Sequence, residues 1–165
     1  MTKGRWMRIL LVLISILILI GVVFMRCTPN RLTAEGGLIN VVLSDGKTQI
    51  VEFDNLSLVP GEECEYIVTL EHALNGQCDV TFDFREIEEK TLKYFIRVKM
   101  IADGEILCDE ILADMFEKEN IVLPVDFAEN KNTKLKIVYF MPFEVGNEAK
   151  NAETIFELRI TTKNK

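Results

Sequence analysis

The side chains that most often carry out chemistry in proteins are sparse in this 165-residue sequence. His72 is the single histidine, which excludes any site that needs two imidazoles, including HExxH zinc centres. Ser15 lies within an apolar run, Ser44 and Ser57 have no nearby base, and no glycine-rich phosphate loop opens a helix. We expect His72 to be a solvated loop residue. The sequence therefore predicts no catalytic, cofactor-binding or metal-binding residues and a protein that is not an enzyme.

Charged residues gather at two places in the middle of the chain. The acidic run Glu86–Glu89 could bind a divalent cation weakly, but the favoured interpretation is a solvated strand end. Lys93, Arg97 and Lys99 alternate with apolar neighbours. This alternation predicts an outward-facing strand surface or gatekeepers at the edge of a sheet. Neither cluster predicts a cofactor.

The cysteines do not form an evident disulfide framework. Cys64 and Cys78 begin two alternating segments, 64–70 and 78–84, that are expected to pair as a hairpin. In that hairpin the two cysteines would lie roughly 20 Å apart along the ladder, whereas a disulfide needs Cα atoms within about 7 Å. Cys64, Cys78 and Cys108 are therefore expected to be reduced, buried residues. Without CxxC spacing, the sequence predicts no cysteine metal site.

An uncharged apolar run distinguishes the N-terminus. Ile9 to Met25 is 17 residues long, and a helix of that length spans roughly 25 Å, at the short end for crossing a bilayer. Lys3, Arg5 and Arg8 precede the run, so the positive-inside rule favours a cytoplasmic N-terminus and an extracellular C-terminal domain. The sequence thus predicts a single-pass protein of the cell membrane, held there by residues 9–25.

The end of the apolar run lacks a small-x-small cleavage site, so an uncleaved signal anchor is favoured. Late cleavage near Ala34, which would release a secreted protein, is one alternative. Lipidation of Cys27 is another, which Arg26 disfavours because a small residue should precede a lipidated cysteine.

Charge divides the chain near the same place. We expect an anchor over residues 1–26, a linker over 27–37 and a folded domain over 38–165. The first 31 residues hold five basic and no acidic residues, and the remaining 14 basic and 26 acidic residues give a net charge of −12. Since phosphate binding needs clustered Lys and Arg, nucleic acid is not expected as a partner.

Short alternating segments fill the chain from Leu38 onward. Asp103-Gly104 is a strong hairpin signal, and Pro124 restricts its segment to an edge or irregular strand. Helix is expected only near 112–118, with a turn near 148–152. The expected strands are 38–43, 49–56, 64–70, 78–84, 92–101, 105–112, 121–127, 135–141 and 155–160. Their spacing predicts an all-β fold, an antiparallel immunoglobulin-like or jelly-roll sandwich preceded by one N-terminal transmembrane helix.

Three segments carry a resemblance to a known family. FDNLSLVPGE at 53–62 enters a strand through a Pro-Gly turn, KIVYFMP at 136–142 is a strand that ends in a turn, and VGNEA at 145–149 precedes the last strand. In this order they resemble the camelysin/TasA-like, SipW-dependent cell-surface proteins of Gram-positive bacteria. We expect a structural role for the VGNE turn, because Gly146 permits a positive φ and Asn147 suits a turn.

The resemblance implies a β-sandwich displayed outside the membrane. Some members of this family form matrix fibres and others are described as casein-cleaving metalloproteases. The favoured hypothesis is a non-enzymatic, membrane-anchored surface protein for envelope structure, adhesion or matrix assembly, with self-association or binding of other surface proteins by strand pairing. Leu38–Leu43 is the best candidate for an edge or donor strand, and the favoured interpretation of this segment is the protein's own first strand. The alternatives are a secreted fibre component, a surface metalloprotease and an accessory subunit of a transporter or secretion apparatus.

Overall fold

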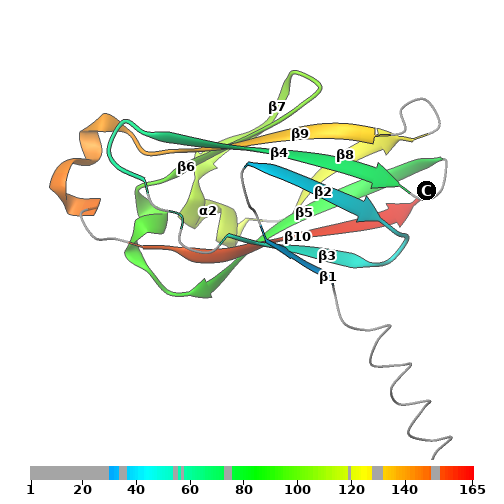
Figure 1. The fold of residues 1–165 in the computed structure, drawn as a ribbon, viewed down its shortest axis with the longest axis horizontal. Helices are drawn as coiled ribbons and strands as arrows, with labels where there is room; N and C mark the ends of the chain where they lie inside the picture. Colours follow the sequence, from blue (N-terminus) through cyan, green and yellow to red (C-terminus); the bar gives the residue numbers. More distant parts are fainter. Residues whose placement is uncertain are drawn as a thin grey trace, which may run out of the picture.

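Figure 1 shows the structure of the chain, a computed structural model. It describes residues 30–33, 37–53, 56, 58–72, 76–118, 120–127, 132–149 and 153–165. The membrane helix predicted over residues 9–25 lies outside this part of the chain. Within the described residues, no helix has the length and apolar character needed to cross a bilayer.

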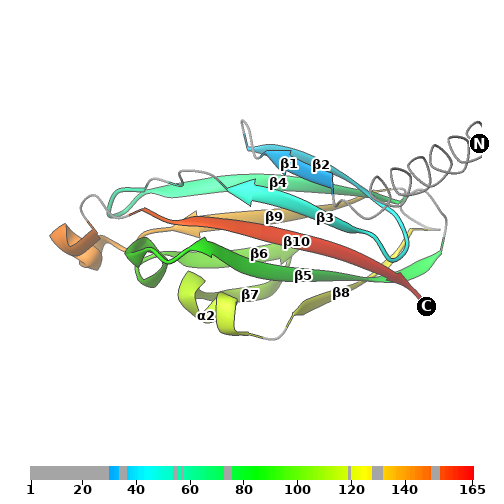
Figure 2. The same cartoon turned by 90° about the horizontal axis from the view of Figure 1, so that it is seen from below.

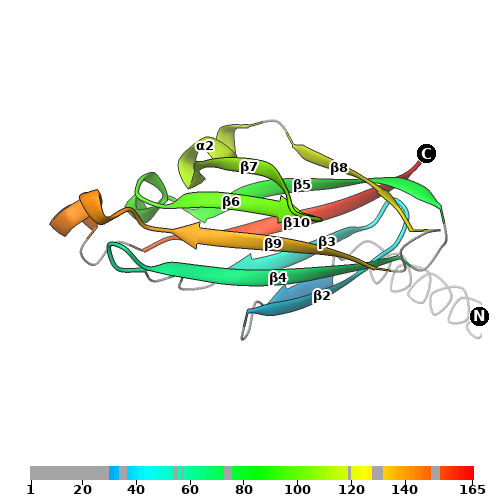
Figure 3. The ribbon, with the colours of Figure 1, turned by 90° about the horizontal axis from the view of Figure 1, so that it is seen from above.

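Two five-stranded sheets make up the fold, which confirms the prediction of an all-β protein. Sheet A has the strand order β1-β3-β10-β5-β8, seen from below in Figure 2, and sheet B has the order β2-β4-β9-β6-β7, seen from above in Figure 3. The elements are β1 (Asn30–Thr33), β2 (Leu38–Leu43), β3 (Thr48–Phe53), β4 (Glu63–His72), β5 (Gln77–Glu88), η1 (Thr91–Tyr94), β6 (Arg97–Ala102), β7 (Glu105–Ile111), α2 (Leu112–Glu117), β8 (Ile121–Asp126), β9 (Asn132–Phe140), η2 (Phe143–Ala149) and β10 (Ile155–Asn164).

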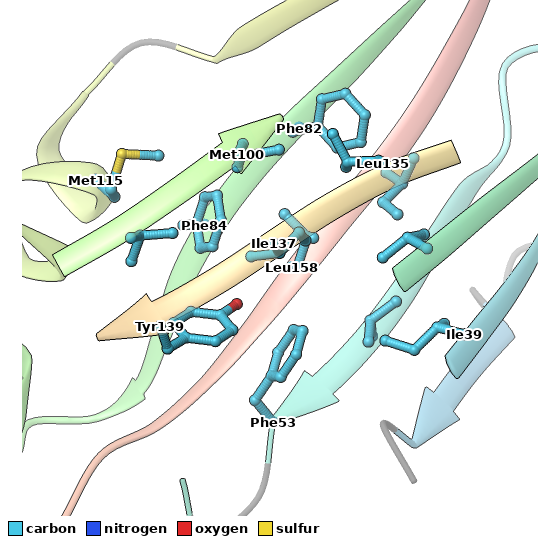
Figure 4. Packing of buried hydrophobic residues seen from close by; sticks show 14 of the residues in the cluster. Ile39, Phe53, Phe82, Phe84, Met100, Met115, Leu135, Ile137, Tyr139 and Leu158 are labelled. Atoms are coloured by element: carbon cyan, nitrogen blue, oxygen red, sulfur yellow. The ribbon is translucent and has the colours of Figure 1, made fainter. Parts of the chain in front are cut away.

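The inner faces of the two sheets enclose one apolar core (Figure 4). Alternate residues point inward, as a strand with one buried face requires. Aromatic rings fill one part of this core. The Phe53 ring centroid lies 5.1 Å from that of Tyr66, 5.4 Å from that of Tyr139 and 5.0 Å from that of Phe156. Such pairs contribute about 0.5–1.5 kcal/mol each beyond the burial of area, so this cluster joins β3 and β10 of sheet A to β4 and β9 of sheet B.

Two local predictions from turn and strand chemistry are confirmed. Asp103 and Gly104 have φ values of 49° and 86° and connect β6 to β7 in an antiparallel pair. Two successive residues with positive φ are what a two-residue type I′ hairpin needs. Pro124 lies in β8, an edge strand of sheet A. The short helix expected near Leu112 is also present, as α2.

The expected purely antiparallel pairing is wrong at two places. β1 pairs with β3 in parallel, and β2 pairs with β4 in parallel. The turn between β2 and β3, closed by a 3.0 Å hydrogen bond from Lys47 N to Ser44 O, leads from sheet B into sheet A. Because the chain changes sheets at this turn, β2 and β3 do not pair with each other. Residues 30–33, predicted within the linker, form β1.

The predicted hairpin of 64–70 with 78–84 is also wrong. β4 belongs to sheet B and β5 to sheet A, so the two strands face each other across the core. The alternation in both strands does mark the buried face, since Val68, Leu70 and Cys78 are buried. Alternation specifies the buried face of a strand but not its neighbour in a sheet. Cys64, Cys78 and Cys108 are free thiols.

The segment predicted as a strand from residue 92 begins with η1 instead. Leu92 and Ile96 are both buried, which suits one turn of helix as well as a strand, because they are four residues apart. Lys93, predicted to face outward, is buried with 7% of its surface exposed. The strand proper, β6, starts at Arg97.

Candidate interaction edge

β2 is an edge strand of sheet B with an unusual composition. Its six residues, LINVVL, include no charge and no proline. Exposed and buried residues alternate along it, and Leu38 and Val42 are 68% and 55% exposed. An edge strand usually carries lysine, proline or a bulge that prevents another strand from pairing with it. β2 has none of these features.

The backbone of β2 has hydrogen-bonding groups directed away from its sheet. The Gly37 carbonyl accepts a 2.7 Å hydrogen bond from Ile67 N. In a parallel ladder, alternate residues bond to the neighbouring strand. The odd-numbered residues of β2 therefore bond to β4, and Leu38, Asn40 and Val42 direct their N–H and C=O groups toward the open edge. The same three residues are the exposed ones.

The edge strand β8 of sheet A is different, because it contains Pro124. Phe127 N donates a 3.0 Å hydrogen bond to Gly76 O. In the antiparallel ladder of β8 with β5, this bond places Val125 and Leu123 among the residues that bond to β5. The Pro124 nitrogen then faces the open edge, where it has no hydrogen to donate.

The remaining two edges are short or charged. β1 has four residues. β7 pairs with β6 through a register shift at Met100 and Ile101, and its residue Glu110 forms an ion pair with Lys118. Of the four edge strands that the structure describes, β2 thus offers the longest uncharged and unbulged edge.

Arg97 and Lys99 lie on the outer face of sheet B, as predicted for an outward-facing surface. Arg97 pairs with Asp109 at 2.9 Å across β6 and β7. On the adjoining strands, Lys136 pairs with Glu65 at 2.5 Å. The alternative role of gatekeeper does not apply, because β6 lies between β9 and β7 and is not an edge.

The acidic run Glu86–Glu89 is bonded to nearby lysines. Glu86 Oε2 accepts a 2.7 Å hydrogen bond from Lys93 Nζ, and Glu86 Oε1 accepts a 3.3 Å bond from Lys90 N. Lys90 Nζ lies 3.3 Å from Glu88. The hydrogen bond to Glu86 is the main cause that raises the pKa of Lys93. Among the residues that the structure describes, no three His, Cys, Asp or Glu side chains are grouped so that they could hold a metal ion.

His72 was predicted to be a solvated loop residue, and this is wrong. It ends β4, is half-buried and stacks on Phe127 with ring centroids 5.2 Å apart. The sequence does contain a signal for this position, because His72 is in phase with the inward-facing Val68 and Leu70.

Cys64 is half-buried near two tyrosines. Burial, followed by a hydrogen bond with Cys64, raises the pKa of Tyr66 to about 12. Burial also raises the pKa of Tyr139, whose hydroxyl is buried without a hydrogen-bond partner in the described structure. Both phenols are therefore neutral near pH 7, and their rings pack in the aromatic core.

Two of the segments that carry the family resemblance meet at one end of the sandwich. Gly61 N donates to Met141 O at 2.7 Å, and Met141 N donates to Glu62 O at 3.0 Å. A Cβ at Gly61, where φ is 87°, would lie 2.4 Å from the Phe143 ring. Gly146 has a φ of 58°, which confirms its expected positive φ. In these turns, the glycines allow the positive φ that the backbone adopts.

Comparison with known proteins does not place the chain in a family. No family model and no curated protein matches the sequence. Among solved structures, the chain is similar to the CUB1-EGF-CUB2 domains of rat MASP-1, with 13% sequence identity and a TM-score of 0.39. This match covers 74% of the present chain and 42% of that structure, so the chain spans less than half the length of the structure it matches.

Proposed function

We propose that this protein is a non-enzymatic cell-surface module, anchored by the apolar run at residues 9–25, that associates through the edge of β2. The anchored part is an immunoglobulin-like or jelly-roll sandwich that faces the cell exterior. Its role is in envelope structure, adhesion or matrix assembly. The resemblance to the camelysin/TasA-like family supports this proposal, as does the basic N-terminal flank of the apolar run.

The open edge of β2 is the observation that carries the proposal. A second strand that aligned with β2 would satisfy the outward N–H and C=O groups of Leu38, Asn40 and Val42 and would place its own outer-face side chains beside theirs. Main-chain hydrogen bonds supply affinity in such strand addition, and alternate side chains supply selectivity. We take a second copy of this chain as the partner.

The test compares two valines with similar exposure on two edge strands. Val42 in β2 is 55% exposed and Val122 in β8 is 52% exposed. We would measure self-association of the full chain in detergent micelles by sedimentation velocity. Val42→Lys is expected to weaken association about tenfold or more, because a lysine on an edge opposes strand pairing. Val122→Lys should change it less than about twofold.

Two results would contradict the proposal. One is a wild-type chain that stays monomeric at every protein concentration up to the solubility limit. The other is an equal effect of the two lysine substitutions, which would mean that charge alone and not the β2 edge governs association. The anchor itself is tested separately by sequencing the N-terminus of the native protein, which should retain residues 9–25.

A further inference from the structure

A groove lies where α2 meets the end of β5, on the side of the sandwich away from β2. It consists of two adjoining hollows of about 340 and 590 Å³. The hollows share Arg85, Phe116 and Glu117 in their linings. The smaller extends to Tyr94, the last residue of η1, and the larger extends to Val122 on β8. We call this the α2 groove; in Figure 2 its helix lies at the lower edge of the sandwich, next to β7.

The charges that line the α2 groove balance. Three cations and three carboxylates contribute to its walls, although the sequence from residue 32 onward carries a net charge of −12. Arg85 Nε lies 2.8 Å from Asp83 Oδ2, and Lys93 Nζ lies 2.7 Å from Glu86 Oε2. Lys118 pairs with a carboxylate of β7. Since its cations are already paired, the groove has little attraction for a strongly charged ligand.

These ion pairs still offer hydrogen bonds to a neutral ligand. A guanidinium has five N–H donors and a carboxylate has about four lone-pair sites, and each pair in the groove uses a fraction of them. Arg85 and Asp83 lie two residues apart on β5, and Arg85 Nε donates a hydrogen bond to Asp83 Oδ2. Their free donors and acceptors lie side by side, an arrangement that matches two neighbouring hydroxyl groups of a sugar ring. Hydrogen bonds to ionised groups are also stronger than those between neutral groups.

Aromatic rings supply the apolar part of the groove. Tyr94 is 56% exposed. Phe116 is half-buried, lines both hollows and is held from behind by the Phe156 ring at 6.0 Å. A rigid aromatic side chain presents a large apolar area at a low entropy cost. The C–H face of a pyranose ring is the part of a sugar that packs on such a surface.

We propose that the α2 groove binds a neutral oligosaccharide, with sugar rings packed on Tyr94 and Phe116 and hydroxyl groups bonded to the Arg85–Asp83 and Lys93–Glu86 pairs. This site lies apart from the β2 edge, and it stands whether or not β2 mediates self-association. The ligand would be a glycan of several rings, because the two hollows follow one another along α2.

The test uses the full chain in lauryldimethylamine oxide micelles, a detergent that contains no sugar. The probes are five neutral hexasaccharides, built from β-1,4-glucose, β-1,3-glucose, β-1,4-N-acetylglucosamine, β-1,4-mannose and β-1,4-xylose. Heparin and polygalacturonate serve as polyanionic comparisons. We expect calorimetric binding of at least one neutral probe. Tyr94→Ala should weaken that binding about tenfold, and Tyr94→Phe should retain it.

Two further variants distinguish binding in the α2 groove from a nonspecific effect of losing an exposed aromatic ring. Ala113→Leu fills the smaller hollow and should weaken binding by a similar factor. Phe143→Ala removes an aromatic ring that is 77% exposed and outside the groove, and it should have no effect. The proposal is overturned if no neutral probe binds, if the polyanions bind in preference, or if Tyr94→Ala and Phe143→Ala act alike. None of these outcomes depends on the oligomeric state of the protein.

Discussion

The edge strands β2 and β8 present their unpaired backbone groups differently. Both border a five-stranded sheet, both have six residues, and both expose a valine to a similar degree. β8 contains a proline whose nitrogen faces the open edge, and β2 has three residues with outward backbone groups that remain able to bond. At the centre of its outward edge, β8 thus presents a proline nitrogen, whereas β2 presents the N–H of Asn40.

The composition of an edge strand decides whether another strand can pair with it. Natural proteins protect edges because unpaired strands promote aggregation. In this chain β8 is protected, β7 is charged and bulged and β1 is short. Among the four described edge strands, β2 is thus the one without such protection, which is why we propose the interaction there.

The largest effect is expected from proline within β2 itself. Val41 is fully buried and directs its N–H toward β4, and the adjacent Asn40 is exposed and directs its N–H outward. Val41→Pro removes a ladder hydrogen bond and buried packing, and it should lower the unfolding free energy by about 3 kcal/mol or more. Asn40→Pro should cost less than about 1 kcal/mol but abolish self-association. Urea denaturation of both variants measures the two losses of unfolding free energy. Equal losses would show that the N–H groups of Val41 and Asn40 do not point to opposite sides of β2.

The second test measures how much the buried side chains of each edge strand contribute to the unfolding free energy. Leu43 in β2 is fully buried, whereas Leu123 in β8 is half-buried. Leu43→Ala should lower the unfolding free energy by about 2–4 kcal/mol, because it leaves a cavity. Leu123→Ala should cost about 1 kcal/mol, since less of its surface is buried. A cost for Leu43→Ala below that for Leu123→Ala would mean that β2 is loosely attached, and the open-edge interpretation would then need a different strand.

The third test converts the closed edge into an open one. Pro124→Thr restores an N–H at the outward edge of β8 and places a residue of high β propensity there. The unfolding free energy should change by less than about 1 kcal/mol, because the Pro124 side chain is exposed. Self-association should increase, and it should persist in the double variant Val42→Lys/Pro124→Thr. If Pro124→Thr stays like the wild type, proline is not what closes this edge.

Local patterns in the sequence predicted the elements of these edges well. Leu38–Leu43 was expected as a strand with the bounds that β2 has, and Pro124 was expected on an edge. Asp103-Gly104 specified its hairpin because two residues with positive φ fix a type I′ turn. In each case the physical cause lies within a few residues, so a short window contains the whole signal.

Features that depend on distant residues were not predictable in the same way. The sequence suggested a β4–β5 hairpin, but these strands lie in different sheets. Alternation does not distinguish the two arrangements, because either one buries the same alternating residues. Lys93 was expected to face solvent, and its burial depends on Glu86 being within 2.7 Å. The α2 groove depends on β5, η1, α2 and β8 meeting, and no motif marks that meeting in the sequence.

The smallest effect concerns how often β8 separates from β5, measured by the reactivity of a cysteine on β5. Cys78 in β5 pairs in register with Val125 of β8 and is 1% exposed, whereas Cys64 is half-buried. Burial is the main cause that raises the pKa of the Cys78 thiol, with Asp79 and Asp126 adding to it, so Cys78 has less thiolate than an ordinary cysteine at any pH below 9. Iodoacetamide should therefore modify Cys64 at least about tenfold faster than Cys78 at pH 8, and the rate at Cys78 should still rise above pH 9.

Mass spectrometry of the labelled peptides distinguishes the two sites in the wild-type chain. Equal rates would mean that β8 separates from β5 readily in solution. β8 would then not be a closed edge, and its contrast with the open edge of β2 would be wrong.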